Sequence, residues 1–312
     1  MGALVTGGAG FIGSNLVDAL LARGDEVTVV DDLSTGRREN LDDALTRGAT
    51  LVEADIRDRA ALEELAGRER PETVFHLAAQ IDVRKSIADP AFDASINVGG
   101  TANVLEAARA AGSRRFVFVS TGGAIYGEGE GQDLPLAEDA PLAPEAPYGQ
   151  SKHAAEGYLA LYERLYSLSG VSLRLGNVYG PRQDPLGEAG VVAIFCGRLR
   201  AGERPTVFGD GRQTRDYIYV GDVVAAALAA AESAASGPIN VGTGVETDVL
   251  ELARRLGELG GSEGFEPELA PPRTGEVQRI AIDPARAERE LGWRAEVGLE
   301  QGLRLTLDSI PA

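Results

Sequence analysis

Short apolar runs alternate with amphipathic segments over about the first 180 residues of the chain. The apolar runs are nearly continuous, which is typical of parallel strands that are buried on both faces. Six strands are predicted, over 2–7, 26–32, 49–55, 73–79, 114–120 and 171–177. Four helices are predicted between them, over 10–24, 58–68, 97–112 and 148–170, the first ending at Gly24. This alternation predicts an α/β fold whose parallel sheet is covered by helices on both faces.

The pattern is looser after residue 180, beginning with a loop rich in proline and glycine over 181–190. Further elements are predicted as helices over 191–202, 221–236 (capped by Asp222) and 249–259, and as strands over 205–211 and 238–244. We expect a smaller, discontinuous α/β region that is interleaved with the first. Residues 1–176 with about 216–240 are predicted to form the first domain, and about 177–215 with 241–312 the second.

Composition narrows the classes of function. The formal net charge of −18 argues against nonspecific binding to nucleic acid and against an anionic membrane surface. The longest apolar stretch, 223–231, is too short to span a bilayer, and no cationic segment precedes the first apolar run, so no signal peptide is expected. Cys196 is the single cysteine, which fits a reducing compartment, and we expect a cytoplasmic protein. Because the chain contains only two histidines in addition to this cysteine, no metal site is predicted.

A glycine-rich turn, VTGGAGFIG, lies between the first predicted strand and the first predicted helix. Gly7 permits a tight turn, Gly10 lets the backbone approach a pyrophosphate, and Gly13 lets the helix pack closely on the sheet. The N-terminus of the helix then faces the anion. In this strand–turn–helix context the spacing predicts a dinucleotide site.

Acidic residues end the second and third predicted strands. Asp31 suits a carboxylate that accepts hydrogen bonds from a ribose diol and would repel a 2′-phosphate, which favours NAD over NADP. Arg37 and Arg38 lie nearby and could soften that preference. A plain turn cap is the alternative role for Asp31. Asp55 could meet the adenine amino group or could be a turn aspartate.

Tyr148 and Lys152 stand four residues apart and therefore share one face of the helix predicted there. Only Lys85 and Lys152 are lysines among the 30 basic residues, and a lysine, unlike arginine, is a compact and tunable ammonium. We expect the Lys152 side chain to lie beneath the Tyr148 ring and to lower the pKa of the phenol from about 10. Such a phenol could exchange a proton with a sugar hydroxyl as hydride leaves the same carbon.

Five motifs in order carry a resemblance to a known family: TGGAGFIG, HLAAQIDVRKS, YGQSK, RLGNVYGPRQ and RDYIYVGDV. Together they resemble the extended short-chain dehydrogenase/reductase family and, within it, the NAD-dependent UDP-glucose 4-epimerases. The resemblance covers nearly the whole chain. It implies a Rossmann-type, doubly wound parallel sheet that binds NAD and a smaller C-terminal region that binds a nucleotide sugar. It also implies a homodimer packed through the helices near 97–112 and 150–168.

The resemblance implies a set of site residues. Those expected to bind the cofactor, besides Tyr148 and Lys152, are Gly7, Gly10, Phe11, Ile12, Gly13, Asp31, Asp32, Ser34, Thr35, Gly36, Asp55, Ile56, Leu77, Ala78, Ala79, Gln80 and Asn97. Those expected to bind the UDP-sugar are Ser120, Thr121, Tyr148, Asn177, Val191, Val192, Thr206, Phe208, Arg215, Arg273 and Glu276. Arg215 and Arg273 would clamp the pyrophosphate and Glu276 would meet the ribose diol, whereas Asn177 could instead be a turn residue.

One position departs from the family pattern. Family members place a serine or threonine four residues before the tyrosine of a turn that here contains Tyr126, and this chain has Gly122 there. We expect the adjacent Thr121 to supply the hydroxyl and to complete a catalytic set with Tyr148 and Lys152, with local backbone or a water as substitutes. His76 is expected to be a satisfied core residue.

The same stretch bears on the reaction. Related dehydratases carry an acidic pair directly after the hydroxyl and decarboxylases a glutamate nearby, whereas this chain has Gly122 and Gly123. The sequence therefore favours an isomerase that interconverts UDP-glucose and UDP-galactose through a transient 4-keto sugar. Alternatives are a 4-epimerase of UDP-glucuronate or of another nucleotide sugar, a dehydratase or decarboxylase, and a noncatalytic NAD-binding protein. Cys196 is expected on an apolar helix face and not as a nucleophile.

Overall fold

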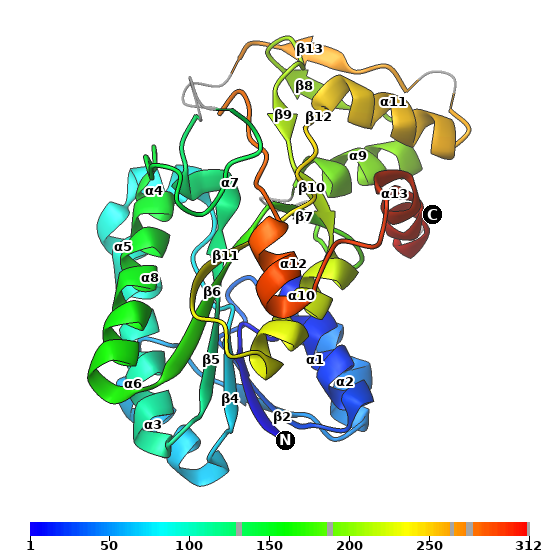
Figure 1. Cartoon of the computed structure of the whole chain (residues 1–312). Helices are drawn as coiled ribbons and strands as arrows, with labels where there is room; N and C mark the ends of the chain where they lie inside the picture. The colour runs from blue at the N-terminus through cyan, green and yellow to red at the C-terminus, as the bar shows by residue number, and fades with distance from the viewer. Residues whose placement is uncertain (129–132, 186–189, 263–264, 273–276, 311–312) are drawn as a thin grey trace.

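A seven-stranded parallel sheet forms the centre of the computed structural model, which describes residues 1–128, 133–185, 190–262, 265–272 and 277–310 (Figure 1). The strand order is β11-β6-β5-β4-β1-β2-β3, and every neighbouring pair is parallel. The strands are β1 (Gly2–Thr6), β2 (Glu26–Asp31), β3 (Thr50–Glu53), β4 (Thr73–His76), β5 (Arg115–Thr121), β6 (Ser169–Leu175) and β11 (Gly237–Val241). The order reverses between β1 and β4, so the crevice for a ligand is expected at the carboxyl ends of these strands.

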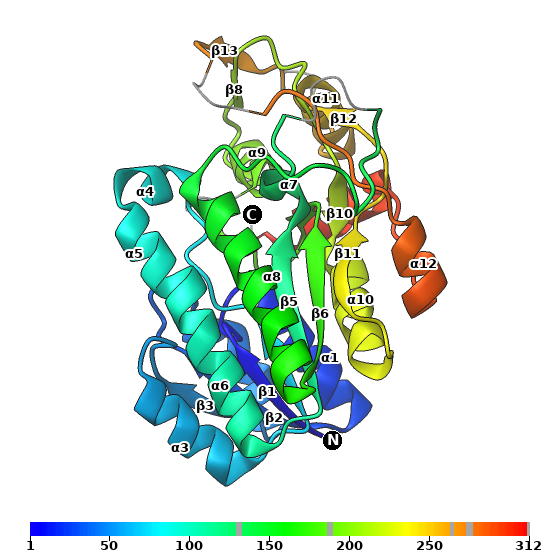
Figure 2. The ribbon, with the colours of Figure 1, turned by 60° about the vertical axis from the view of Figure 1, so that its left-hand side comes forward.

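Helices cover both faces of the sheet, as the sequence predicts (Figures 1 and 2). One face carries α1 (Phe11–Arg23), α2 (Asp42–Thr46), α10 (Val220–Glu232) and α12 (Ala285–Leu291). The other face carries α3 (Arg59–Glu69), α6 (Thr101–Ala111) and α8 (Pro147–Tyr166). Each layer buries its own apolar cluster, and the predicted Rossmann-type fold class is confirmed.

A smaller region stands beyond the carboxyl ends of the central strands (Figure 2). Its elements are β7 (Asn177–Tyr179), α9 (Val191–Arg200), β8 (Thr206–Phe208), β9 (Thr214–Arg215), β10 (Tyr217–Tyr219), β12 (Thr247–Asp248), α11 (Val249–Leu259), β13 (Glu268–Ala270) and α13 (Leu299–Ser309). Strands pair two by two, β10 with β7, β12 with β9 and β13 with β8. A separate apolar cluster packs α9, α11 and α13 together. The predicted domain boundaries stay a prediction.

The chain between β4 and α6 is more helical than the sequence pattern indicates. It forms α4 (Val83–Ala88), α5 (Pro90–Ala94) and a π-helical turn, Ser95–Gly100, that runs into α6. Asp82 and Asp89 cap α4 and α5 by accepting backbone N–H groups. These two short helices lie against the N-terminal half of α8 (Figure 2).

The predicted capping role of Asp222 is wrong. The N-cap of α10 is Tyr219, and Asp222 lies in the first turn of the helix. Its carboxylate accepts the backbone N–H groups of Glu296 and Val297 at 3.2 and 3.0 Å. Asp222 therefore fastens the C-terminal segment to α10, a long-range contact that a local capping pattern does not reveal. Gly24, by contrast, ends α1 in the left-handed conformation, as predicted.

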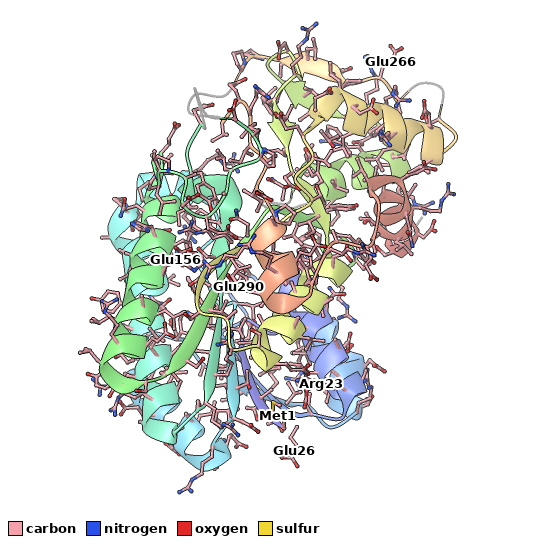
Figure 3. All side chains as sticks on the ribbon, in the orientation of Figure 1. Met1, Arg23, Glu26, Glu156, Glu266 and Glu290 are labelled. Carbon is pink, nitrogen blue, oxygen red and sulfur yellow. The ribbon has the colours of Figure 1, made fainter. Side chains whose placement is uncertain are left out.

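A buried ion pair joins the sheet to the helices at its carboxyl edge. Arg174 of β6 donates to both carboxylate oxygens of Glu156 on α8, at 3.0 and 2.8 Å (Figure 3 labels Glu156). Arg174 also donates to the Tyr126 hydroxyl, which in turn donates to Asn240 of β11. Bidentate geometry and these added hydrogen bonds offset the cost of removing both charges from water. The network fixes α8 against the strands on which the candidate site is built.

No helix in the part of the chain that the structure describes is long and apolar enough to cross a membrane. Met1, Arg23 and Glu26 lie at the amino-terminal edge of the sheet, on the side away from the smaller region (Figure 3). The N-terminal amine and Arg23 both pair with Asp25 there.

Candidate functional site

The glycine-rich turn between β1 and α1 is packed as tightly as its spacing predicts. Gly7 has a positive φ of 71°, and a Cβ atom added to it would lie 2.6 Å from the Ala78 nitrogen. A Cβ atom on Gly13 would overlap the Gly7 carbonyl oxygen, whereas one on Gly10 would meet only that oxygen, at 3.2 Å. Gly7 and Gly13 are thus required by the protein itself, and Gly10 keeps the start of α1 open to a ligand.

Asp31 ties this turn to the end of β2. Its carboxylate, buried at 7% exposure, accepts the Ala9 and Leu33 N–H groups at 2.9 Å each. Burial raises the pKa of Asp31, and the two backbone hydrogen bonds act against that rise. The Gly36 backbone passes directly over the carboxylate, since a Cβ atom there would lie 2.8 Å from Oδ1. Asp31 therefore has the structural role of a turn residue at the very place where the ribose is expected.

The other acidic candidates near β2 and β3 have local partners. Asp32 accepts hydrogen bonds from the backbone and hydroxyl of Ser34. Asp55 pairs with Arg57, whose side-chain hydrogen bond lowers the pKa of Asp55. Ile56 is buried against Gly100. The remaining cofactor candidates lie at the start of α1 (Phe11 and Ile12) and in the turns that follow β2 and β4 (Thr35, Leu77, Ala78 and Ala79).

Lys152 lies beside the carboxyl end of β5 and is only 3% exposed. Its ammonium donates to the Val119 carbonyl oxygen at 2.8 Å and lies 4.7 Å from the centre of the Phe118 ring. Burial lowers the pKa of Lys152 to about 8, and the carboxylates of Asp93 and Glu156 oppose this. The ammonium therefore points into the sheet edge.

Tyr148 occupies the first turn of α8, directly after Pro147. The ring is half-buried, but burial around the phenol oxygen raises its pKa to about 12, and a hydrogen bond with Thr121 opposes that rise. The expectation that Lys152 lies under the ring and lowers this pKa is not what the structure shows. Desolvation is the largest effect on the pKa of Tyr148, and the Lys152 ammonium is directed to the Val119 carbonyl oxygen.

The prediction that Thr121 supplies the hydroxyl missing at Gly122 stays a prediction. A Cβ atom on Gly122 would meet Ile282 at 2.8 Å, so a side chain there would point at the core. Thr121, in the preceding position, makes the hydrogen bond to Tyr148. Ser120 is 3% exposed, and its hydroxyl has no hydrogen-bond partner among the described residues.

Gln80 and Asn97 form a reciprocal pair behind these groups. The Gln80 N–H donates to Asn97 Oδ1 and the Asn97 amide donates to the Gln80 carbonyl oxygen, both at 2.9 Å. Asn97 also donates to Ser151 on α8 at 3.1 Å. Their predicted contact with a cofactor stays a prediction, since the pair has an internal role of its own.

The candidates for substrate binding are spread over the smaller region. Asn177, the first residue of β7, lies next to the catalytic turn, since its Oδ1 would be 3.3 Å from a Cβ on Gly123. Arg215 lies on β9 and donates to the Thr214 carbonyl. Thr206, Phe208 and Val191 are at least partly exposed, whereas Val192 is buried in the apolar cluster of this region. Arg273 and Glu276 lie outside the described residues.

His76 and Cys196 behave as the sequence predicts. His76 is fully buried between the Thr6 and Thr101 hydroxyls, and burial lowers its pKa to about 3. Cys196 is fully buried, and burial raises its pKa to about 12, which removes it as a nucleophile. Within the described ranges, no group of three or more His, Cys, Asp or Glu side chains could hold a metal ion.

Comparison with known proteins places the chain in a family. The model of the NAD dependent epimerase/dehydratase family matches residues 3–242. The chain belongs to this family. The resemblance predicted from the motifs is thereby confirmed, and NAD, the cofactor of the family, is confirmed with it.

Three relatives of the family are similar along their whole length. The UDP-glucose 4-epimerase of Mycolicibacterium smegmatis is 49% identical, over 99% of this chain and 98% of that one. The solved UDP-glucose 4-epimerase of Thermotoga maritima with UDP-glucose has a TM-score of 0.95 at 47% identity, covering 99% of this chain and 98% of that one. The Thermus thermophilus UDP-glucose 4-epimerase in complex with NAD has a TM-score of 0.91 at 46% identity, with the same coverage.

The residues present fit the family's dinucleotide. The turn around Gly10 leaves room at the N-terminus of α1, where unpaired backbone N–H groups and the helix dipole favour a diphosphate. Because the chain has a net charge of −18 and would repel an anion, binding of a diphosphate requires a local positive group such as this helix end. Tyr148 and Lys152 lie beyond the same sheet edge, within the crevice expected at the reversal of strand order.

Two polar residues of α4 and α5, the helices packed on α8, are not among the candidates from the sequence. Ser86 accepts the Tyr148 N–H at 3.2 Å, and Asp93 is fully buried one helical turn before Asn97. The four-residue spacing of Asp93 and Asn97 was the available signal, because it puts two polar side chains on one helix face.

Gly13→Ala is expected to destabilise the turn and to lower NAD retention, since the added methyl group overlaps the Gly7 carbonyl and the turn must move. Overpacking of this kind costs about 1–3 kcal/mol. Gly67→Ala is the matched control, because Gly67 lies on exposed α3 with open space around it and should gain up to about 1 kcal/mol. Thermal unfolding and the NAD content of the purified proteins provide the comparison; equal NAD content in the two variants would contradict the assignment.

Proposed function

We propose that this chain is an NAD-dependent isomerase that interconverts UDP-glucose and UDP-galactose. The hydrogen-bonded pair Thr121–Tyr148 beside buried Lys152, at the carboxyl edge of a Rossmann-type sheet, carries the proposal. The three full-length relatives at 46–49% identity, each named UDP-glucose 4-epimerase, support the choice of substrate.

Tyr148 is the proton-transferring group in this proposal. Its phenolate accepts the proton of the sugar O4 hydroxyl and later returns it, so that a 4-keto sugar exists only between the two transfers. When bound, NAD takes up hydride from C4 and gives it back, and its oxidised ring adds positive charge near the phenol. The hydroxyl of Thr121 favours the ionised phenol, against the burial that otherwise raises its pKa.

The proposed substrate residues are those named from the sequence. Asn177 would hold the sugar diphosphate, and Ser120 is a further candidate for substrate binding. Arg215 would bind the pyrophosphate, with Arg273 and Glu276 as further candidates outside the described residues. Thr206, Phe208, Val191 and Val192 are proposed around the uracil, with buried Val192 acting through its packing.

The turn after β5 favours epimerisation over elimination or decarboxylation. Gly122 faces Ile282, and Gly123 faces Asn177, so neither position supplies an acid to the sugar. A second acid would be needed to expel water or to handle a keto acid after the first oxidation. A 4-epimerase of UDP-glucuronate or of another nucleotide sugar keeps this geometry and is the second candidate. A noncatalytic NAD-binding protein would leave the Thr121–Tyr148 pair without a role.

A homodimer and a cytoplasmic location belong to the same proposal. The outer face of α8 exposes large apolar groups, including Tyr158 at 41%, Leu165 at 60% and Tyr166 at 49%. Arg109 of α6 lies 5.1 Å from the Tyr166 ring and pairs with Glu106, which adds polar groups at the rim. An aromatic and aliphatic patch with charged neighbours suits a protein interface.

Tyr148→Phe is expected to lower the rate of UDP-glucose to UDP-galactose conversion by about 10²–10⁴-fold, since the general base is removed. NAD should remain bound at the wild-type level. Tyr219→Phe is the control, because it deletes the hydroxyl of another half-buried tyrosine outside the site. Wild-type turnover in Tyr148→Phe would refute the assignment.

A panel of nucleotide sugars tests the substrate. We expect UDP-glucose and UDP-galactose to interconvert with a higher kcat/KM than UDP-glucuronate or the N-acetyl forms of the two hexoses. Product analysis by nuclear magnetic resonance would separate epimers from dehydration and decarboxylation products. A clear preference for UDP-glucuronate would favour the second candidate, and no product with any sugar would favour the noncatalytic one.

Light scattering tests the dimer. Wild-type protein should have twice the chain mass, and Leu165→Glu should shift it toward the monomer because a charge enters an apolar interface. Leu305→Glu on α13, another exposed leucine, should leave the mass unchanged. A monomeric wild-type protein would refute this part of the proposal.

A further inference from the structure

Asp93 is a fully buried carboxylate to which no role has been given so far. It lies on α5, with 0% exposure. Its Oδ1 atom accepts the side-chain amides of Gln80 at 2.9 Å and of Asn97 at 3.1 Å. Its Oδ2 atom is buried without a hydrogen-bond partner in the described part of the chain. A half-satisfied buried carboxylate is costly, so it calls for a compensating charge nearby.

Hydrogen bonds lead from Asp93 to the backbone of the proposed catalytic base. The Asn97 amide that donates to Asp93 also donates to Ser151 Oγ at 3.1 Å. Ser151 Oγ in turn donates to the Tyr148 carbonyl oxygen at 3.0 Å. Asp93 is thus connected, through two buried side chains, to the first turn of α8. The helices α5 and α8 also pack directly on each other (Figure 2).

The charges around Lys152 single out Asp93 as its available counter-ion. On α8 itself Glu156 is already committed to Arg174 in a bidentate pair. From β4 His76 faces the ammonium in its neutral form, since its pKa is about 3. From β5 only the Val119 carbonyl oxygen and the Phe118 ring approach.

The remaining neighbours of Asp93 do not neutralise it. The Tyr148 phenol carries no positive charge. Lys85 of α4 is exposed, and its ammonium lies 5.0 Å from the centre of the Phe92 ring. The Asp93 charge acts on both members of the catalytic pair, raising the pKa of Lys152 and that of Tyr148.

We propose that Asp93 is a positioning residue for the Tyr148/Lys152 pair. Through Gln80, Asn97 and Ser151 it fixes the first turn of α8, and its buried carboxylate is the counter-charge that keeps Lys152 an ammonium. This inference rests on the proposed function, because it gives Asp93 its importance through the catalytic base. It also predicts a physical property of the phenol that can be measured without any substrate.

The sign of the effect follows from the charge. A negative carboxylate stabilises the ammonium and destabilises the phenolate, so its removal lowers the pKa of both Lys152 and Tyr148. Activity is lost on the acid side because the phenol is protonated, and on the alkaline side because the lysine is deprotonated. Both limbs of the profile should therefore shift in the same direction. The whole profile of kcat against pH is therefore displaced to lower pH.

Asp93→Asn separates the charge from the hydrogen bonds, since an amide oxygen can still accept from Gln80 and Asn97. We expect the pH profile of kcat to move down by about one pH unit, the lower end of what a neighbouring buried charge produces. Asp93→Ala should show the same displacement together with a further loss of kcat, about tenfold, because the link to α8 is broken as well. Asp93→Glu keeps the charge and should keep the wild-type position of the profile.

Asp222→Asn is the matched control. Asp222 is also a buried aspartate, 5% exposed, but it lies on α10, on the opposite face of the sheet. Its replacement should lower stability without moving the pH profile, because its carboxylate serves the Glu296 and Val297 backbone.

A titration of the phenol makes the test independent of turnover. The absorbance of tyrosinate, taken as the difference between each protein and its Tyr148→Phe counterpart, reports the ionisation of Tyr148 alone. Its midpoint should be lower in Asp93→Asn than in the wild type and unchanged in Asp222→Asn. If the wild type converts no nucleotide sugar, the proposed function fails while this titration still decides on Asp93. An unmoved midpoint in Asp93→Asn, or an equal displacement in Asp93→Glu, would overturn the inference.

Discussion

The buried ammonium of Lys152 is the interaction on which the site depends. Seven parallel strands end at one edge, and the ends of β1, β2, β4 and β5 bring the glycine turn, Asp31, Gln80 and Thr121 to it. A lysine that is 3% exposed at this edge loses most of its hydration. Its charge is retained only because the Val119 carbonyl, the Phe118 ring and two carboxylates surround it.

This requirement explains why so many contacts converge on α8. The helix carries Tyr148, Lys152 and Glu156 on successive turns of one face, and their partners lie on β5 and β6. Thr121 holds the phenol, Val119 holds the ammonium, and Arg174 holds Glu156. The Arg174 network continues through Tyr126 to Asn240 of β11, so the last strand of the sheet also supports α8. A shift of α8 would disturb all of these pairs at once.

Much of the fold could be predicted from local pattern because its strands are continuous apolar runs and its helices begin and end at clear signals. Gly24 and the glycine turn are examples, since their backbone conformation requires glycine whatever the tertiary context. The role of Asp222 could not be predicted, because its partners at 296 and 297 are more than 70 residues away. The same holds for the pKa of Tyr148, where the spacing of two residues reveals their common face but not the desolvation around the phenol.

Close packing at Gly122 accounts for the position where the sequence departs from the family pattern. A Cβ atom at 122 would press on Ile282 at 2.8 Å and on the Leu175 carbonyl at 3.2 Å, so this backbone gives a side chain there no room to reach the phenol. Successive residues at the end of a strand point to opposite faces, so the neighbouring Thr121 can direct its hydroxyl to Tyr148. Glycine at 122 then follows from the close approach of Ile282, which packs with Tyr126 and so connects the catalytic turn to the C-terminal part of the chain.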